Sequence, residues 1–164
     1  MSLFAIGDLH LSLGSDKPMD IFSGWDHYVE RLEENWRDTI GDEDTVVLAG
    51  DSSWGMSLQE SLTDFTFLEG LPGKKIILKG NHDYWWSTKN KMDSFFAEQG
   101  FRSLQILHNN SYVVENVVVC GSRGWLFEMG EEHDKKILTR DVYKRQIQQL
   151  VKNKDWICTN FLVQ

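Results

Sequence analysis

Residues 75–83 read KIILKGNHD, a short apolar run that ends in a glycine and three polar side chains. The same order occurs in two earlier stretches, LFAIGDLH at residues 3–10 and TVVLAGD at residues 45–51. Apolar runs of this length, separated by segments with helical spacing, predict buried strands of a parallel sheet. The carboxyl ends of parallel strands share one edge of their sheet, where ligand crevices form. The sequence therefore predicts an α/β fold with a site at that edge.

The segments between these apolar runs place hydrophobic residues at helical spacing. Ser57 and Glu60 have the spacing of a capping box, which predicts a helix that begins near residue 57. Further along, Asn116 separates two β-branched runs and predicts the turn of a hairpin. We therefore expect helices at 25–39, 57–68, 89–98 and 134–151, a hairpin of 112–115 with 117–120, and a last strand at 156–163.

The composition indicates a single packed domain rather than a disordered chain. Of the 164 residues, 41% are hydrophobic and 12% are aromatic, which is enough for a substantial core. Seventeen basic against 25 acidic side chains leave a net charge of −8, which argues against general nucleic-acid binding. No apolar run approaches the roughly 18 residues of a membrane helix. Cys120 and Cys158 stand far apart without a zinc-type spacing, so we expect a reducing, cytoplasmic environment.

A short oxygen ligand follows the glycine at each of the three strand ends, namely Asp8, Asp51 and Asn81. His10 and His82 add an imidazole to two of these loops. One glycine followed by Asp is common turn chemistry, but three such ends with two histidines indicate a metal centre. A donor set that contains imidazole favours Mn, Fe, Zn or Co over Mg or Ca.

The same residues suit a displacement reaction at phosphorus. A carboxylate such as Asp51 can bridge two cations, and cations about 3.5–4 Å apart can hold the attacking and leaving oxygens and supply hydroxide. His82, which Asp83 follows, suits a different role, because a positioned imidazolium can stabilise phosphoryl charge or protonate the leaving oxygen. Another class of metal hydrolase is an alternative, although such enzymes usually start from paired histidines, which this sequence lacks.

These blocks resemble, in order and spacing, the first three signature blocks of the calcineurin-like metallophosphoesterases. Residues 75–86 and GSRGW at residues 121–125 resemble a bacterial branch of that family labelled only as predicted phosphohydrolases. The resemblance covers roughly residues 2–140 and implies two mixed β-sheets flanked by helices, the metallophosphoesterase β-sandwich. It also implies that a metal-activated hydroxide hydrolyses phosphomonoesters or phosphodiesters, with a small molecule or a nucleotide as substrate.

The resemblance implies a role for each matching residue and a cofactor of two divalent transition metal ions, Mn, Fe, Zn or Co. Arg123 lies in a glycine-containing loop, where it could bind a substrate phosphate or form a surface salt bridge. By position, Asp8 and His10 would bind the first metal, Asp51 would bridge, Asn81 would bind the second metal, and His82 with Asp83 would form the catalytic acid or charge-stabilising pair.

The sequence departs from the family pattern towards its end. The family completes its site with a further histidine after a later strand and with a Gly-His-x-His block, and neither is present in the sequence. We therefore expect residues 1–164 to form the N-terminal part of a single domain that is incomplete at the C-terminus, with 141–164 a doubtful match. The alternative to an active enzyme is an inactive fragment that binds at most one metal ion.

Four tryptophans follow the strand ends closely. Two interpretations are open for them, because they could stack on an aromatic leaving group or pack around the site. They are Trp54, Trp85, Trp86 and Trp125.

Overall fold

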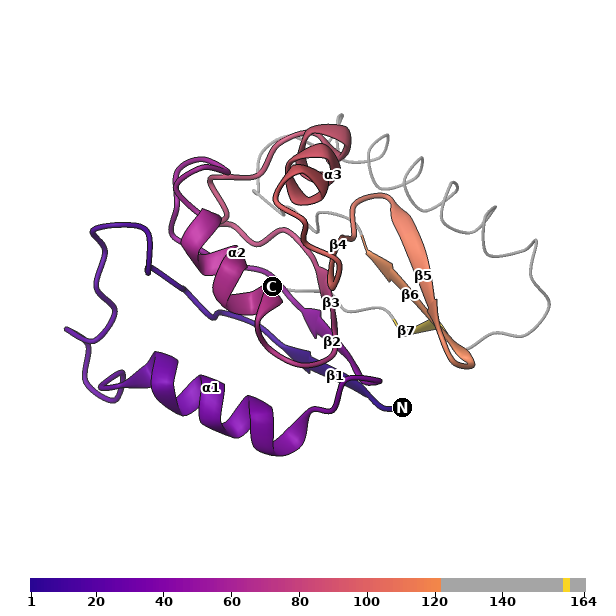
Figure 1. The fold of residues 1–164 in the computed structure, drawn as a ribbon, viewed down its shortest axis with the longest axis horizontal. Coiled ribbons are helices and arrows are strands. Elements are labelled where there is room, and N and C mark those ends of the chain that lie inside the picture. The colour runs from indigo at the N-terminus through magenta and orange to yellow at the C-terminus, as the bar shows by residue number, and fades with distance from the viewer. Residues whose placement is uncertain (122–157, 160–164) are drawn as a thin grey trace, which may run out of the picture. The chain divides into compact units, whose positions relative to one another are not determined.

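The computed structural model of the chain describes residues 1–121 and 158–159. The chain divides into two compact units, Met1–Ile106 and Leu107–Gln164. Figure 1 shows their helices and strands. Across the described residues, every helix is too short or too polar to span a bilayer.

The first unit contains a four-stranded parallel sheet with the strand order β1-β2-β3-β4. The last residues of its strands are level, because Ile6 pairs with Leu48, Leu48 with Ile77, and Ile77 with Ile106. The predicted parallel sheet is therefore confirmed. The three glycine-containing loops all begin at the same edge of this sheet. The elements are β1 (Leu3–Ile6), α1 (Tyr28–Thr39), β2 (Thr45–Leu48), α2 (Leu62–Glu69), β3 (Lys74–Ile77), α3 (Lys89–Glu98) and β4 (Leu104–Ile106).

The second unit contains a three-stranded sheet with the order β5-β6-β7. Strands β5 (Asn110–Val114) and β6 (Val117–Gly121) form the predicted antiparallel hairpin. The short strand β7 (Cys158–Thr159) pairs with β6 in parallel, so this sheet is mixed. The α/β class with two sheets is thus confirmed. The predicted helix at 134–151 lies outside the described residues, as does the predicted strand at 156–163 except for β7.

The core of the first unit forms where its three helices pack against the sheet. Phe65 lies near the centre of this core. Its ring centroid is 4.8 Å from that of Trp85 and 5.1 Å from that of Phe96. This packing fixes the helices against the strands whose ends carry the polar loops. The buried side chains of this cluster include Trp36 of α1 and Ile40 directly after it, Phe65 and Leu68 of α2, Met92 and Phe96 of α3, and Val46, Leu48 and Ile77 of the sheet.

Helix α2 begins at Leu62, five residues later than predicted. One bond of the capping box is present, because the Glu60 N–H donates to Ser57 Oγ at 3.2 Å, whereas the Glu60 carboxylate accepts at 2.9 Å from the N–H of Met56, one residue before Ser57. They close a separate turn, however, after which the buried Ser61 hydroxyl bonds to Ser53 Oγ at 3.1 Å. This tertiary contact fixes where the helix begins and overrides the local signal.

Lys75, in strand β3, is a fully buried lysine. Its ammonium donates hydrogen bonds to the Leu71 carbonyl oxygen and to Ser103 Oγ. The Glu69 carboxylate in turn accepts from Ser103 Oγ at 2.6 Å. Burial lowers the pKa of Lys75 from its ordinary value of 10.5 to about 8.

This burial predicts an alkaline rise in stability. Between pH 8 and 10.5 the unfolded chain keeps a proton that folded Lys75 releases, so the free energy of unfolding increases with pH. We expect a gain of about 2 kcal/mol between pH 7 and pH 9.5, measured by urea unfolding, that Lys75→Met removes. Lys74→Met, at the exposed neighbour in the same strand, should keep it. Equal pH dependence in the two variants would contradict the prediction.

Candidate metal centre

The loops that follow β1 and β2 run side by side beyond the ends of their strands. The Asp8 N–H donates to the Gly50 carbonyl oxygen at 3.0 Å, and the His10 N–H donates to the Asp51 carbonyl oxygen at 2.9 Å. A third bond joins the Leu11 N–H to the Ser52 carbonyl oxygen at 3.1 Å. These backbone bonds fix the distance between the two loops that carry candidate ligands.

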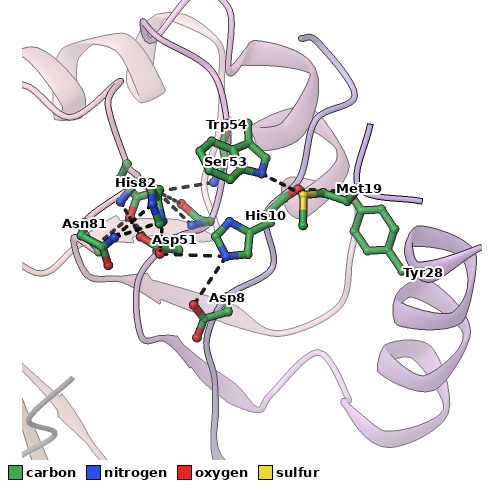
Figure 2. Close-up of polar contacts among 12 residues, drawn as sticks. Asp8, His10, Met19, Tyr28, Asp51, Ser53, Trp54, Asn81 and His82 are labelled. Carbon is green, nitrogen blue, oxygen red and sulfur yellow. Dashed lines mark hydrogen bonds and ion pairs between the residues drawn. The ribbon is translucent and has the colours of Figure 1, made fainter. Parts of the chain in front are cut away.

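The Asp51 carboxylate lies at the centre of the candidate ligands (Figure 2). Its Oδ2 lies 2.9 Å from His82 Nδ1 and 4.0 Å from His10 Nε2, which in turn lies 3.5 Å from Asp8 Oδ1. The Asn81 side-chain nitrogen lies 3.1 Å from His82 Nδ1. The structure thus brings together Asp8, His10, Asp51, Asn81 and His82, all of which were selected from the sequence.

Three of these residues have a left-handed backbone. The φ angles are 57° at Asp8, 46° at His10 and 52° at Asp51. This region is unfavourable for residues with a side chain, and such conformations collect at functional sites. The backbone bonds between the two loops therefore hold the candidate ligands in conformations that the chain would not adopt freely.

Gly80 allows the loops after β2 and β3 to approach closely. A Cβ atom at Gly80 would collide with the carboxylate and the backbone nitrogen of Asp51. The neighbouring Gly50 has a φ of 113°, and a Cβ there would lie 2.7 Å from the Gly80 backbone. The two glycines that mark the strand ends in the sequence are thus required by the position of Asp51.

The Asp83 carboxylate lies fully buried behind the loop that carries Asp51. It accepts hydrogen bonds from the backbone N–H groups of Asp51 at 2.8 Å and Gly80 at 2.7 Å. Ser52 donates to it twice, through N–H and Oγ, each at 2.9 Å, and the Trp85 indole N–H donates at 2.9 Å. A carboxylate with several donors of this kind fixes the backbone around it. Asp83 therefore holds the turn from which Asp51 extends.

Asp64 supports the loop after His10 and was missed by the sequence analysis. Its buried carboxylate accepts hydrogen bonds from the Leu13 N–H at 2.7 Å and from Ser53 Oγ. Burial raises the pKa of Asp64. In the sequence Asp64 is only one acidic residue of a helix, and nothing there shows that it meets a loop 51 residues away.

Of the tryptophans that follow the strand ends, Trp85 and Trp86 belong to the core, whereas Trp54 lies at the candidate site. Trp85 is buried in the core, and Trp86 is half-buried and packs against it. The Trp54 ring stacks on His10, with the ring centroids 5.0 Å apart and an angle of 24° between the planes. Trp125 and the predicted phosphate ligand Arg123 lie outside the described residues.

The donor set fits a divalent transition metal ion. The ligand atoms of His10, Asp51 and His82 all lie within 4.8 Å of one another. Imidazole nitrogen together with carboxylate oxygen is a set typical of Zn, Fe, Mn and Co sites. The exposed Asp8 carboxylate, next to His10, offers a further oxygen.

Comparison of the sequence with protein families shows the family of this chain. The sequence profile described as calcineurin-like phosphoesterase matches residues 1–159, so the chain belongs to this family of metal-dependent phosphoester hydrolases. No curated protein sequence matches the chain significantly.

Two solved structures are similar to the chain at low sequence identity. A protein of unknown function from Aquifex aeolicus, AQ665, is 16% identical over 90% of this chain and 75% of its own, with a TM-score of 0.49. A phosphopantetheinyl hydrolase from Mycobacterium tuberculosis is 14% identical over 87% of this chain, with a TM-score of 0.45. The chain spans about half of that hydrolase, 51% of its length.

Proposed function

We propose that this protein hydrolyses small phosphoesters, monoesters or diesters, at the cluster around Asp51. The observation that carries the proposal is the convergence of two imidazoles and a carboxylate, with ligand atoms within 4.8 Å, at the carboxyl edge of a parallel sheet. A divalent metal ion bound there would supply hydroxide near neutral pH and polarise the phosphoryl oxygens.

The family resemblance and the geometry together support specific ligands. Asp8, His10 and Asp51 would hold one ion, since their donor atoms follow one another at 3.5 and 4.0 Å. Asn81 would bind a second ion with Asp51, although its neutral amide oxygen is a weaker ligand. Manganese suits this mixture, because carboxylate and carbonyl oxygens favour Mn.

His82 and Asp83 receive different roles in this proposal. The His82 side chain is 38% exposed, so its ring can reach a substrate, and the Asp51 carboxylate orients it through Nδ1. His82 would stabilise phosphoryl charge or give a proton to the leaving oxygen. Asp83, whose carboxylate bonds to backbone N–H groups of the neighbouring loop, would position Asp51 rather than act on the substrate.

Metal titration of the purified chain tests the proposal. We expect one tightly bound Mn²⁺ per chain, because a set of three ligands with open positions resembles that of catalytic metal sites. Hydrolysis of p-nitrophenyl phosphate or its diester should disappear with EDTA and return with Mn²⁺. One bound ion without turnover, or no bound ion at all, would overturn the proposal and support the inactive alternative.

A further inference from the structure

Two aromatic rings and a lysine border the metal-ligand cluster, and we call Lys17, Trp54 and Tyr84 the aromatic rim. The Trp54 ring centroid lies 4.9 Å from that of His82, and the Tyr84 centroid lies 6.1 Å from it. The two rim rings lie 6.4 Å apart. A short linker would therefore be enough to connect a phosphate placed at His82 with a ligand group at the rim.

The rim rings are held in place without being part of the core. The Trp54 indole N–H donates to Met19 Sδ at 3.1 Å, and its ring stacks on His10 (Figure 2). The Tyr84 N–H donates to the His82 carbonyl oxygen at 2.8 Å, while the residue remains 49% exposed. Trp85 and Trp86, which follow in the sequence, pack on the core instead. Tyr84 thus presents an aromatic surface to solvent beside the cluster.

Lys17 places a cation over both rings. Its Nζ lies 5.0 Å from the centroid of Trp54 and 5.7 Å from that of Tyr84. It also donates to the Trp54 carbonyl oxygen at 3.4 Å and to Met56 Sδ at 3.5 Å. Among the described residues Lys17 has no carboxylate in an ion pair, so its charge is available to an anionic ligand.

We propose that the aromatic rim selects phosphoesters whose alcohol carries a flat aromatic ring, which makes nucleotides the preferred substrate class. This inference rests on the proposed function, because it places the phosphate at the metal-ligand cluster. The ring stacks on Tyr84 and Trp54, and Lys17 moves from the rings to the negative charge of the ester. Stacking on a side-chain ring tolerates any base, since every base has a π-face. We therefore expect the protein to prefer phosphoesters that carry a base over those without one, and to show little preference between different bases.

Calorimetric titration of the Mn²⁺-loaded chain with non-hydrolysable phosphonate analogues of adenosine 5′-monophosphate and ribose 5-phosphate isolates the contribution of the base. The nucleotide should bind at least about fivefold more tightly, the lower end of what stacking on one aromatic side chain supplies. Tyr84→Ala should remove most of this preference and leave binding of the ribose analogue unchanged, and Tyr84→Phe should retain the preference. Lys17→Gln should weaken binding of the nucleotide more than that of uncharged adenosine. Phe22→Ala, at another exposed aromatic residue, is the matched control.

The outcomes separate the two proposals. Equal affinity for the two analogues in the unaltered chain, or an equal loss of both in Tyr84→Ala, would overturn the role of the rim. Because the phosphonate analogues are not hydrolysed, the titration does not depend on turnover. Hydrolysis without a base preference would leave the proposed function intact and remove the inference, whereas base-dependent binding without hydrolysis would do the opposite.

Discussion

Asp51→Asn is expected to abolish tight metal binding and to lower the kcat/KM for phosphoester hydrolysis at least about a thousandfold. The Asp51 carboxylate lies between both imidazoles of the cluster, 2.9 Å from His82 and 4.0 Å from His10. The asparagine amide has the same shape. Its oxygen can still accept the hydrogen bond that the His82 backbone N–H donates to Asp51 Oδ1 at 2.8 Å. The amide has lost the negative charge, however, and one acceptor oxygen. Calorimetric titration with Mn²⁺ and steady-state kinetics measure the two effects.

His82→Gln separates metal binding from catalysis in the same experiment. If His82 acts on the phosphoryl group, this variant keeps its metal while kcat falls by about 10²–10⁴, the range for a lost general acid. Equal loss of metal in the His82 and Asp51 variants would instead make His82 a ligand. Asp93→Asn, on the surface of α3 and paired with Lys89 in an exposed i,i+4 bridge, should change neither quantity.

The convergence of the candidate ligands was predictable because it depends on local signals. Each of β1, β2 and β3 ends in apolar residues and is followed by a glycine and an Asp or Asn, and parallel pairing brings those strand ends to one edge. Strand β4 gave no comparable signal, since it has three residues with Gln105 in the middle. Its place in the sheet depends on pairing with β3, a contact that short-range periodicity does not report.

The side-chain partners at the site were less predictable than its location. Asp83 follows His82 directly, and a paired role for the two was therefore expected. In the tight turn after β3, however, consecutive side chains diverge, and the Asp83 carboxylate meets backbone N–H groups about 30 residues earlier in the chain. The same holds for Lys17 and Trp54, which are 37 residues apart. Such contacts depend on how distant loops pack together. The residue types near each position in the sequence do not indicate this packing.

Asp83→Asn tests whether this buried carboxylate positions Asp51. The carboxylate accepts from several donors at once, including the Asp51, Ser52 and Gly80 N–H groups and the Trp85 indole. An amide has one acceptor oxygen, and its NH₂ group would face other donors, so some of these buried groups lose their partner. We expect the free energy of unfolding to fall by about 4 kcal/mol, and Mn²⁺ affinity by about 10–100-fold because Asp51 is no longer held in place.

Urea unfolding and calorimetric Mn²⁺ titration measure both effects, with Ser52→Ala as the matched control. That variant removes a single hydroxyl donor from the same carboxylate, so it should lower stability by only about 1 kcal/mol and leave Mn²⁺ affinity unchanged. If Asp83→Asn behaves like Ser52→Ala, the charge of Asp83 is not needed to hold the loop. If turnover falls while stability and metal affinity stay intact, Asp83 acts on the reaction together with His82, as the sequence first indicated. A joint loss of stability and metal affinity is expected, because the hydrogen bonds that fold this turn also hold Asp51 at the candidate metal centre.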